Sequence, residues 1–347
     1  WGCYQLIGVW VAGDIVGITE ETIMQGHWEP WIKNLIGTYV AEESALGQVL
    51  IGEFGIFTMT ITYLLGLLLP LVVGFYVALS ILEDSGYLPR LATFVDRLMT
   101  SIGLNGRAVI PVILGFGCVQ LGTITTRILG SKRERTIATS ILNFAIPCSA
   151  QLGVIIGMLA AVGIKLTLAY VLVIFLSLAV LGTILNKSIP GESSSLLIDL
   201  PPMRLPRIGN VIRKTGVRAY FFMKEALPWF FAGSLGVSIL QISGGLRAWQ
   251  ELVAPLTEGW LSLPKEAATA FVMGMVRRDF GAAGLTDLAL APWQVVVALV
   301  VITLFVPCIA SLMILFKERG FREGMAVWAG AWVAAFGIGG VLAQIVM

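Results

Sequence analysis

Charged residues and histidine are both scarce in this chain of 347 residues. Only 13% of the residues are charged and 57% are hydrophobic, whereas about 25% of the residues of an average soluble domain are charged. His27 is the only histidine, which excludes HExxH metalloproteases and every metal site that needs two imidazoles. The composition therefore indicates a polytopic membrane protein.

Motifs of common soluble enzymes and nucleic-acid binders are missing too. The chain has no GxxxxGK(S/T), no GxSxG and no Ser/His/Asp set, so it shows no phosphate loop or hydrolase site. Its net charge is +2 and no basic run is interleaved with aromatics, so nucleic acid is not an expected partner. The four cysteines are scattered without a CxxC pair, and no disulfide framework is indicated.

Apolar runs predict the membrane spans. Runs of the required length, about 20 residues, lie near 56–82, 137–160, 166–186, 225–243, 292–316 and 324–346. Two further runs, 107–118 and 265–275, are too short to cross and predict re-entrant or interfacial segments. The stretch after Trp1 is also short and unlike a signal peptide, so we expect a truncated helix with further chain upstream.

Positive charges are concentrated in a few segments. Of the 23 lysines and arginines, 17 lie in 83–107, 127–135, 187–224 and 317–322. The segment 17–55, by contrast, holds only Lys33 beside six glutamates. Because basic loops of membrane proteins stay in the cytoplasm, we expect the basic segments there and the acidic one outside. The chain can follow this topology only if 107–118 enters and leaves the membrane on the cytoplasmic side.

The chain also repeats itself. Residues 67–88 align with 225–246 at an offset of 158, and AIPCSAQL (145–152) aligns with FVPCIASL (305–312) at an offset of 160. Each copy holds three spans and one short run, so the second copy is predicted to be inverted relative to the first. Inverted repeats are typical of alternating-access transporters, whose substrate site lies near the midplane where broken helices meet.

The predicted fold class is an all-α polytopic membrane protein with two inverted repeats, each with three spanning helices plus a short re-entrant helix. The expected parts are a truncated N-terminal helix with an external acidic loop, a first repeat, a cytoplasmic basic linker, and a second repeat with a C-terminal helix: 1–55, 56–186, 187–224 and 225–347. In the linker, 200–215 is expected to lie on anionic lipid as an amphipathic helix or to dock a soluble domain.

The repeated Pro-Cys motif joins a helix breaker to a thiol. Pro147 has no N–H and pushes away the carbonyl four residues back, that of Asn143. In a membrane such a carbonyl needs a partner in the protein, in water or on a cation, and Cys148 adds a soft sulfur beside it. Proline kinks are common in membrane helices and cysteine is a small apolar filler, but the second copy at Cys308 favours a functional site.

Cys118 ends a short run in the motif GFGC, whose glycines let the backbone turn and approach a ligand. The repeat places Arg277, with Asp279 nearby, opposite this thiol, so the two copies would offer different chemistry. The alternative is that Arg277, Arg278 and Asp279 form a charge cluster at the membrane interface.

Glu83 and Asp84 lie at the cytoplasmic end of the first span. They would receive or release a divalent cation, or they belong to a hydrogen-bonded turn closed by Ser85 and Gly86 and paired with Arg90. The second interpretation is favoured.

Several motifs together resemble the membrane domain of the FeoB family of bacterial ferrous iron transporters: LEDSGYLPR, GLNGRAVIPVILGFGC, IPCSAQLGV, LPPMRLPR, LPKEA, RRDFGAAGL and FVPCIA. They follow the family's order between about residues 48 and 322. The resemblance implies two Gate repeats, Fe²⁺ as the transported substrate at the bacterial inner membrane, no permanently bound cofactor and no enzyme activity in this chain. The implied partners are a cytoplasmic GTP-binding domain of the same protein, small cytosolic accessory proteins, the lipid bilayer and, as an open alternative, further copies of the chain.

In this family the cysteines of the GFGC and CSA motifs are the proposed iron ligands, which implies Cys118 and Cys148 here, with Cys308 as the match in the second repeat. The chain departs from the family pattern at 119–122 and 151–153, where many members carry prolines. The polar residues expected along the pathway are Asn143, Ser149, Gln151, Gln120, Thr123, Glu83, Asp84, Arg277 and Asp279. Zn²⁺, Mn²⁺ or a nucleoside-like solute stays an alternative cargo, and an enzyme with a cysteine nucleophile would lack a nearby base.

Overall fold

The computed structural model of the protein describes residues 11, 14–39, 44–52, 55–191, 202–276, 278–286, 288–305 and 308–346. Within these residues every regular element is a helix. Five helical stretches are long and apolar enough to cross a membrane: Leu46–Asp84, Ile164–Ser188, Ile208–Ile242, Pro292–Arg319 and Phe321–Ile345. A sixth arises if Tyr87–Ser101 and Gly106–Gly117, bent by 106°, count as one broken span. The expectation of an all-α polytopic membrane protein is confirmed.

Five of the six expected spans coincide with these stretches, and the sixth, 137–160, is interrupted at the proline that predicted a helix break. The structure divides it into α8 (Lys132–Ala145) and α9 (Ser149–Val162). The backbone between them is extended, with φ −101° and ψ 108° at Ile146. Pro147 explains the break, because proline donates no hydrogen bond and drives the residue before it out of the helical conformation.

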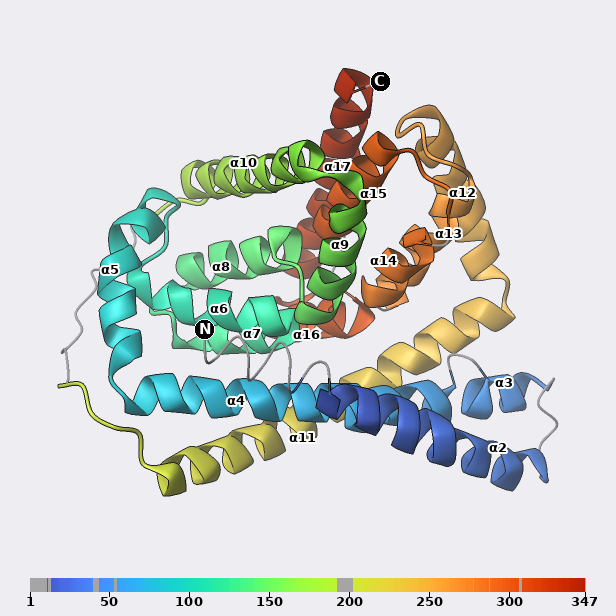
Figure 1. Ribbon diagram of the computed structural model, residues 1–347, viewed down its shortest axis with the longest axis horizontal. Coiled ribbons are helices and arrows are strands. Elements are labelled where there is room, and N and C mark those ends of the chain that lie inside the picture. Colours follow the sequence, from blue (N-terminus) through green and yellow to red (C-terminus); the bar gives the residue numbers. More distant parts are fainter. Residues whose placement is uncertain are drawn as a thin grey trace. The chain divides into compact units, whose positions relative to one another are not determined.

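The chain divides into two compact units, and each takes segments from both halves of the sequence. The first consists of Trp1–Leu88 and Leu200–Arg247. Its described helices are η2 (Gly17–Trp28), α2 (Glu29–Gly37), α3 (Ala45–Ile51), η3 (Ile56–Thr60), η4 (Thr62–Leu68), α4 (Leu69–Asp84) and α11 (Ile208–Ile242). Within this unit α4 packs along α11 (Figure 1).

Two expected features of the first unit differ in the structure. The acidic segment expected as a loop is helical over most of its described residues, because Pro30 stands in the first turn of α2 and Ser44 caps α3 by accepting a hydrogen bond from the Gly47 N–H at 3.0 Å. The expected end of the basic linker, at 224, falls inside α11. The basic segment therefore continues into the apolar one as a single helix of 35 residues.

The second unit consists of Pro89–Asp199 and Ala248–Met347. Its described helices are α5 (Tyr87–Ser101), η5 (Gly106–Ala108), α6 (Val109–Gly117), α7 (Val119–Thr125), η6 (Thr126–Ile128), α8, α9, α10 (Ile164–Ser188), α12 (Gly245–Gly259), α13 (Glu266–Val276), α14 (Arg278–Thr286), α15 (Pro292–Leu304), α16 (Ile309–Arg319) and α17 (Phe321–Val346). Helix α15 is buried from Val295 to Leu304 and forms the centre of the core, with α10 and α17 packed against it. The rings of Phe271, Phe305 and Phe336 meet beside it.

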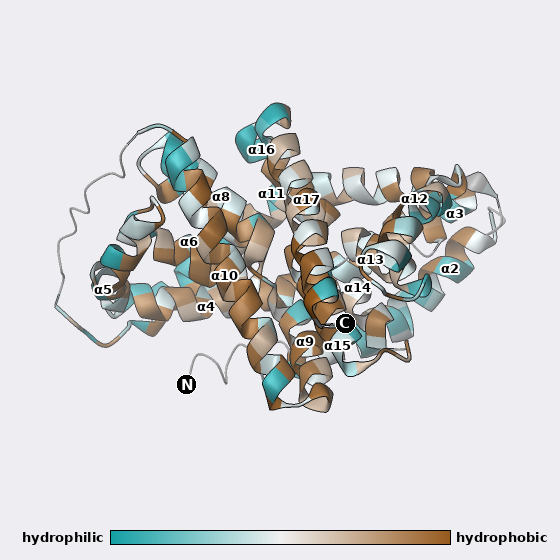
Figure 2. Ribbon diagram, turned by 90° about the horizontal axis from the view of Figure 1, so that it is seen from above, coloured by the Kyte–Doolittle hydropathy of each residue, from teal (hydrophilic) through white to brown (hydrophobic). Residues whose placement is uncertain are grey.

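Helix α10 presents a different surface. Hydrophobic residues cover most of its length (Figure 2), yet Leu168 is 62% exposed and Phe175 is 65% exposed. An apolar helix of 25 residues that keeps such side chains exposed is suited to face lipid.

The order of helices in the second unit repeats. The series α5–α6–α7–α8–α9 is followed after α10 and α11 by α12–α13–α14–α15–α16. Helices α6 and α7 lie side by side, as do α13 and α14 (Figure 1). A Cβ on Gly122 would lie 2.7 Å from the carbonyl oxygen of Pro111, and one on Gly281 would lie 2.6 Å from Cα of Gly274. Glycine therefore allows the close approach in both pairs of short helices.

Candidate functional site

Each of three cysteines stands at an interruption between helices of the second unit. Cys118 separates α6 from α7 and is extended, with φ −148° and ψ 116°. Cys148 precedes the first residue of α9, and Cys308 precedes the first residue of α16. None of these three cysteines forms a disulfide with another described residue. The helix breaks that the sequence predicts thus place every predicted sulfur ligand of the pathway at the start of a helix.

The break at Cys308 is in contact with α7, the helix that follows Cys118. Cys118 is buried, and Cys148 and Cys308 are half-buried. The Gln120 side chain connects α7 to the second break, because its Nε2 donates to Sγ of Cys308 at 3.7 Å. Sγ of Cys308 lies 3.2 Å from Oγ of Ser311. Residues separated by 188 positions in the sequence are therefore brought together.

The carbonyls at the end of α8 are occupied by an arginine. Nη1 of Arg278 donates to the carbonyl oxygen of Ile146 at 2.9 Å, and Nη2 donates to that of Asn143 at 3.2 Å. Arg278 is only 4% exposed. The expected charge cluster with Arg277 and Asp279 falls on side chains outside the described residues and stays a prediction, whereas the Asn143 carbonyl expected to serve a cation has a guanidinium as its partner. One feature of the sequence could have indicated this role: an arginine stands beside a short intramembrane helix. Burying an arginine in a membrane is costly, so such a residue usually has a specific partner.

The end of α15 is capped by a neutral side chain instead. Nε2 of Gln151, on α9, donates to the carbonyl oxygen of Ile302 at 3.0 Å. Nearby, the Tyr170 hydroxyl and Oγ1 of Thr303 share a hydrogen bond of 2.9 Å. Gln151 was predicted as a pathway residue, and its described role is to join the α9 segment to the second break.

Three buried side-chain amides keep an oxygen without a hydrogen-bond partner among the described residues: those of Gln120, Asn143 and Gln151. Each is at most 1% exposed. The orientation of Asn143 is fixed because its Nδ2 donates to the Thr139 carbonyl at 2.8 Å, and also to Oγ1 of Thr123 at 3.3 Å. A carbonyl cannot donate, so the amide oxygen faces the other way. Buried unpaired oxygens are costly and are ready ligands for a cation.

These oxygens are not part of a preformed cage of charged ligands in the part of the chain that the structure describes, because no group of three or more His, Cys, Asp or Glu side chains there is arranged to hold a metal ion. Three predicted pathway side chains, those of Ser149, Arg277 and Asp279, lie outside the described residues. Helix α13 ends at Val276 and α14 begins at Arg278.

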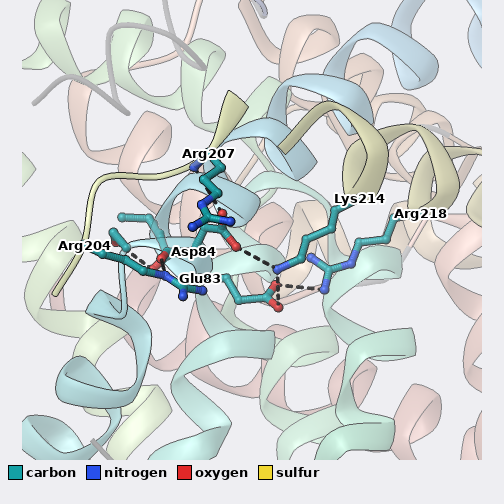
Figure 3. A network of polar contacts seen from close by, with 8 residues as sticks. Glu83, Asp84, Arg204, Arg207, Lys214 and Arg218 are labelled. Atoms are coloured by element: carbon teal, nitrogen blue, oxygen red, sulfur yellow. Dashed lines mark hydrogen bonds and ion pairs between the residues drawn. The ribbon is translucent and has the colours of Figure 1, made fainter. Parts of the chain in front are cut away.

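Glu83 and Asp84 belong to a separate network in the first unit (Figure 3). Nζ of Lys214 lies 3.2 Å from Oε1 of Glu83 and 3.1 Å from Oδ1 of Asp84. Nη2 of Arg218 lies 2.8 Å from Oε2 of Glu83. The backbone N–H of Arg207 donates to Oδ2 of Asp84 at 3.3 Å. The network therefore fastens the end of α4 to the start of α11.

The turn after these carboxylates has the expected form but different partners. The Ser85 N–H donates to the Ile81 carbonyl at 3.0 Å, and the Gly86 N–H donates to the Glu83 carbonyl at 3.1 Å. Gly86 has φ +75°, which favours glycine. Lys214 and Arg218, rather than the expected Arg90, pair with the carboxylates.

Membrane-spanning helices, broken helices with cysteines at the breaks and pairs of short helices define the class: an all-α polytopic membrane protein. The model of the family Gate, described as "Nucleoside recognition", matches residues 65–162 and 223–322, more than half of the chain. The model described as "Ferrous iron transport protein B C terminus" matches residues 166–218.

Curated relatives agree with these matches. Proteins named "Fe(2+) transporter FeoB" are similar from Methanocaldococcus jannaschii (28% identity over 73% of this chain and 43% of the relative), Staphylococcus aureus strain COL (29%, over 72% and 42%) and Legionella pneumophila strain Paris (33%, over 68% and 30%). The chain belongs to the FeoB family, of whose membrane domain it carries the Gate segments. It spans about two fifths of the length of the first two relatives, and no solved structure matches it significantly.

Proposed function

We propose that this chain is the membrane part of a transporter for Fe²⁺, which crosses the bacterial inner membrane as the transported substrate. The observation that supports this most is the grouping of three thiols and three unpartnered amide oxygens around helix breaks in one unit. The relatives' names indicate the same cargo. Since the chain spans only part of these relatives, a cytoplasmic GTP-binding domain and small accessory proteins are proposed as its regulatory partners.

The ligands proposed for Fe²⁺ are of two kinds. Cys118 and Cys148 supply sulfur, and the amide oxygens of Gln120, Asn143 and Gln151 supply harder donors. Such a mixed set suits a borderline divalent ion better than Mg²⁺ or Ca²⁺, although sulfur alone would also favour Cu⁺ and Zn²⁺. A site without a closed cage fits a transported ion, which has to leave as readily as it enters. Cys308, already in contact with Gln120 and Ser311, is proposed as a secondary ligand.

The two inverted repeats, 56–186 and 225–347, are part of the proposal. Two observations support them: the helix order of α5 to α9 recurs in α12 to α16, and one family model matches two segments of the chain. Each of the two Pro-Cys breaks is capped by a side chain from the other repeat. Alternating access would then change the contacts between the repeats around a site that both of them line.

A second candidate keeps the scaffold and changes the cargo to Zn²⁺, Mn²⁺ or a nucleoside-like solute. The description of the Gate family, "Nucleoside recognition", is the observation that favours a nucleoside. Thiols at the site argue for a metal instead, because sulfur gains little from contact with a sugar or a base.

Uptake into proteoliposomes under anaerobic conditions tests the proposal. Fe²⁺, Mn²⁺, Zn²⁺ and a labelled nucleoside are offered separately to the wild type and to the variants Cys118→Ser and Cys148→Ser. Cys3→Ser, at the one cysteine of the sequence to which no role is assigned, is the control. We expect Fe²⁺ uptake in the wild type and the control, and a loss of at least tenfold in the two site variants. Wild-type rates in both variants would refute the thiol ligands, and uptake of the nucleoside alone would refute metal transport.

A further inference from the structure

The guanidinium of Arg278 occupies a position that the sequence alone suggests for a metal. Pro147 has no N–H, so the carbonyl of Asn143 loses the partner that a continuous helix would give it. The carbonyl of Ile146 follows in the extended stretch before Cys148. In the described structure both oxygens accept hydrogen bonds from Arg278, at 3.2 Å and 2.9 Å.

The position of Arg278 is set by backbone packing. The residue is the first of α14, which packs against both α13 and α9. A Cβ on Gly281 would lie 2.8 Å from the carbonyl oxygen of Ala270 on α13, so the two short helices are in direct backbone contact. A long side chain anchored on such a rigid pair of helices reaches the break between α8 and α9 in a defined direction.

Charge decides what this contact does. An arginine side chain carries a full positive charge and five N–H donors, and it accepts no hydrogen bonds. A carbonyl oxygen that accepts from a guanidinium is a weaker ligand for a metal ion, and a second cation beside it is repelled, more strongly in a buried site than in water. Cys148 is two residues from Ile146, so its thiol is exposed to the electrostatic field of the Arg278 guanidinium.

We infer that Arg278 is a tethered cation that closes the break between α8 and α9, so that a transported cation passes only when the guanidinium leaves the carbonyls of Asn143 and Ile146. This inference rests on the proposed function for the identity of the cargo, but the electrostatic closure itself does not depend on iron. Arg278 is therefore a gating residue, because its guanidinium occupies the two carbonyl oxygens that would otherwise be ligands for the transported cation.

The test is charge-selective labelling of Cys148 in the purified protein. Rates of modification by a trimethylammonium-ethyl methanethiosulfonate and by neutral methyl methanethiosulfonate are measured on the Cys148 peptide by mass spectrometry. Each rate is divided by the rate with a free thiol in solution, and the ratio of the two rates removes changes in thiol reactivity that affect both reagents. We expect the neutral reagent to be favoured by about tenfold in the wild type, because a unit charge within a few ångströms acts through a low effective dielectric.

Three variants complete the test. Arg278→Gln should bring the ratio close to one, and Arg278→Lys should keep the preference for the neutral reagent. The matched control is Arg133→Gln, since Arg133 also donates to backbone carbonyls, those of Gly103 and Ile189, but does so at the start of α8. It should keep the wild-type ratio.

An unchanged ratio in Arg278→Gln, or no preference in the wild type, would overturn the inference. The wild-type measurement keeps the proposal falsifiable if Arg278→Gln does not fold. Fe²⁺ uptake is measured on the same preparations. Wild-type protein that takes up no Fe²⁺ but keeps the labelling preference would refute the proposed cargo and leave the electrostatic closure standing.

Discussion

The two Pro-Cys breaks of the second unit are similar in sequence and differ in what caps them. The break before Cys148 receives two hydrogen bonds from Arg278, and the break before Cys308 receives one from Gln151. Each cap comes from the other half of the chain. The first break therefore carries a buried positive charge while the second holds a neutral amide, and a repeated motif has produced two chemically different sites.

The difference has an energetic side. Removing the partner of a buried carbonyl costs more than the hydrogen bond contributed, because the orphaned group stays out of water. The first break has two carbonyls at risk and the second has one. The two caps are thus expected to differ in how much they stabilise the protein as well as in charge.

The largest expected effect separates the two caps directly. Arg278→Met should lower the free energy of unfolding by about 3 kcal/mol, because two buried carbonyls lose their donors. Gln151→Met should lower it by about 1–2 kcal/mol, since only the Ile302 carbonyl is orphaned. Thermal unfolding in detergent micelles measures both. Equal losses in the two variants would contradict the asymmetry.

A second prediction compares the two pairs of short helices. Gly122→Ala and Gly281→Ala should each destabilise the protein by roughly 1–3 kcal/mol, because the added Cβ would lie within 2.8 Å of backbone in the facing helix. Gly157→Ala is the matched control, since nothing lies within 4 Å of its Cβ. This control should be neutral or slightly stabilising through helix propensity. If all three alanines behaved alike in the same unfolding assay, close backbone packing would not hold these pairs together.

The helix breaks and the short helices were predictable from local sequence. Pro147 alone locates the end of α8, and the lengths of 107–118 and 265–275 exclude them as spans. The partners were not predictable. Arg278 meets a carbonyl 132 residues away, and Lys214 meets Asp84 across 130 residues. Such contacts depend on how helices pack, and no local pattern in the sequence encodes them.

A third, smaller effect tests the neutral second break. Tyr170→Phe removes the hydroxyl that bonds Oγ1 of Thr303 at 2.9 Å and should cost about 1 kcal/mol. In a double-mutant cycle with Thr303→Val, a coupling energy of about 0.5–1.5 kcal/mol is expected. Strict additivity of the two substitutions would show that the hydroxyls do not interact.

The smallest effect lies in the first unit, where charges are partly exposed. Lys214→Ala removes the ammonium between Glu83 and Asp84, yet the Lys214 side chain is 35% exposed. Solvent screening limits the expected loss of stability to about 1 kcal/mol, and Arg218→Ala should lose less because it meets Glu83 alone. Added salt should weaken both effects. If Lys214→Ala lowered the free energy of unfolding as much as Arg278→Met, the expected difference between buried and exposed cations would be contradicted.

The central claim is that Fe²⁺ meets sulfur and amide oxygen together at the helix breaks of the second unit. X-ray absorption at the iron edge, recorded on anaerobic protein loaded with Fe²⁺, tests it most directly. We expect the wild-type spectrum to require both sulfur and oxygen or nitrogen ligands, with the sulfur contribution reduced in Cys118→Ser and unchanged in Cys3→Ser. A wild-type spectrum that needs only oxygen and nitrogen ligands would contradict the account.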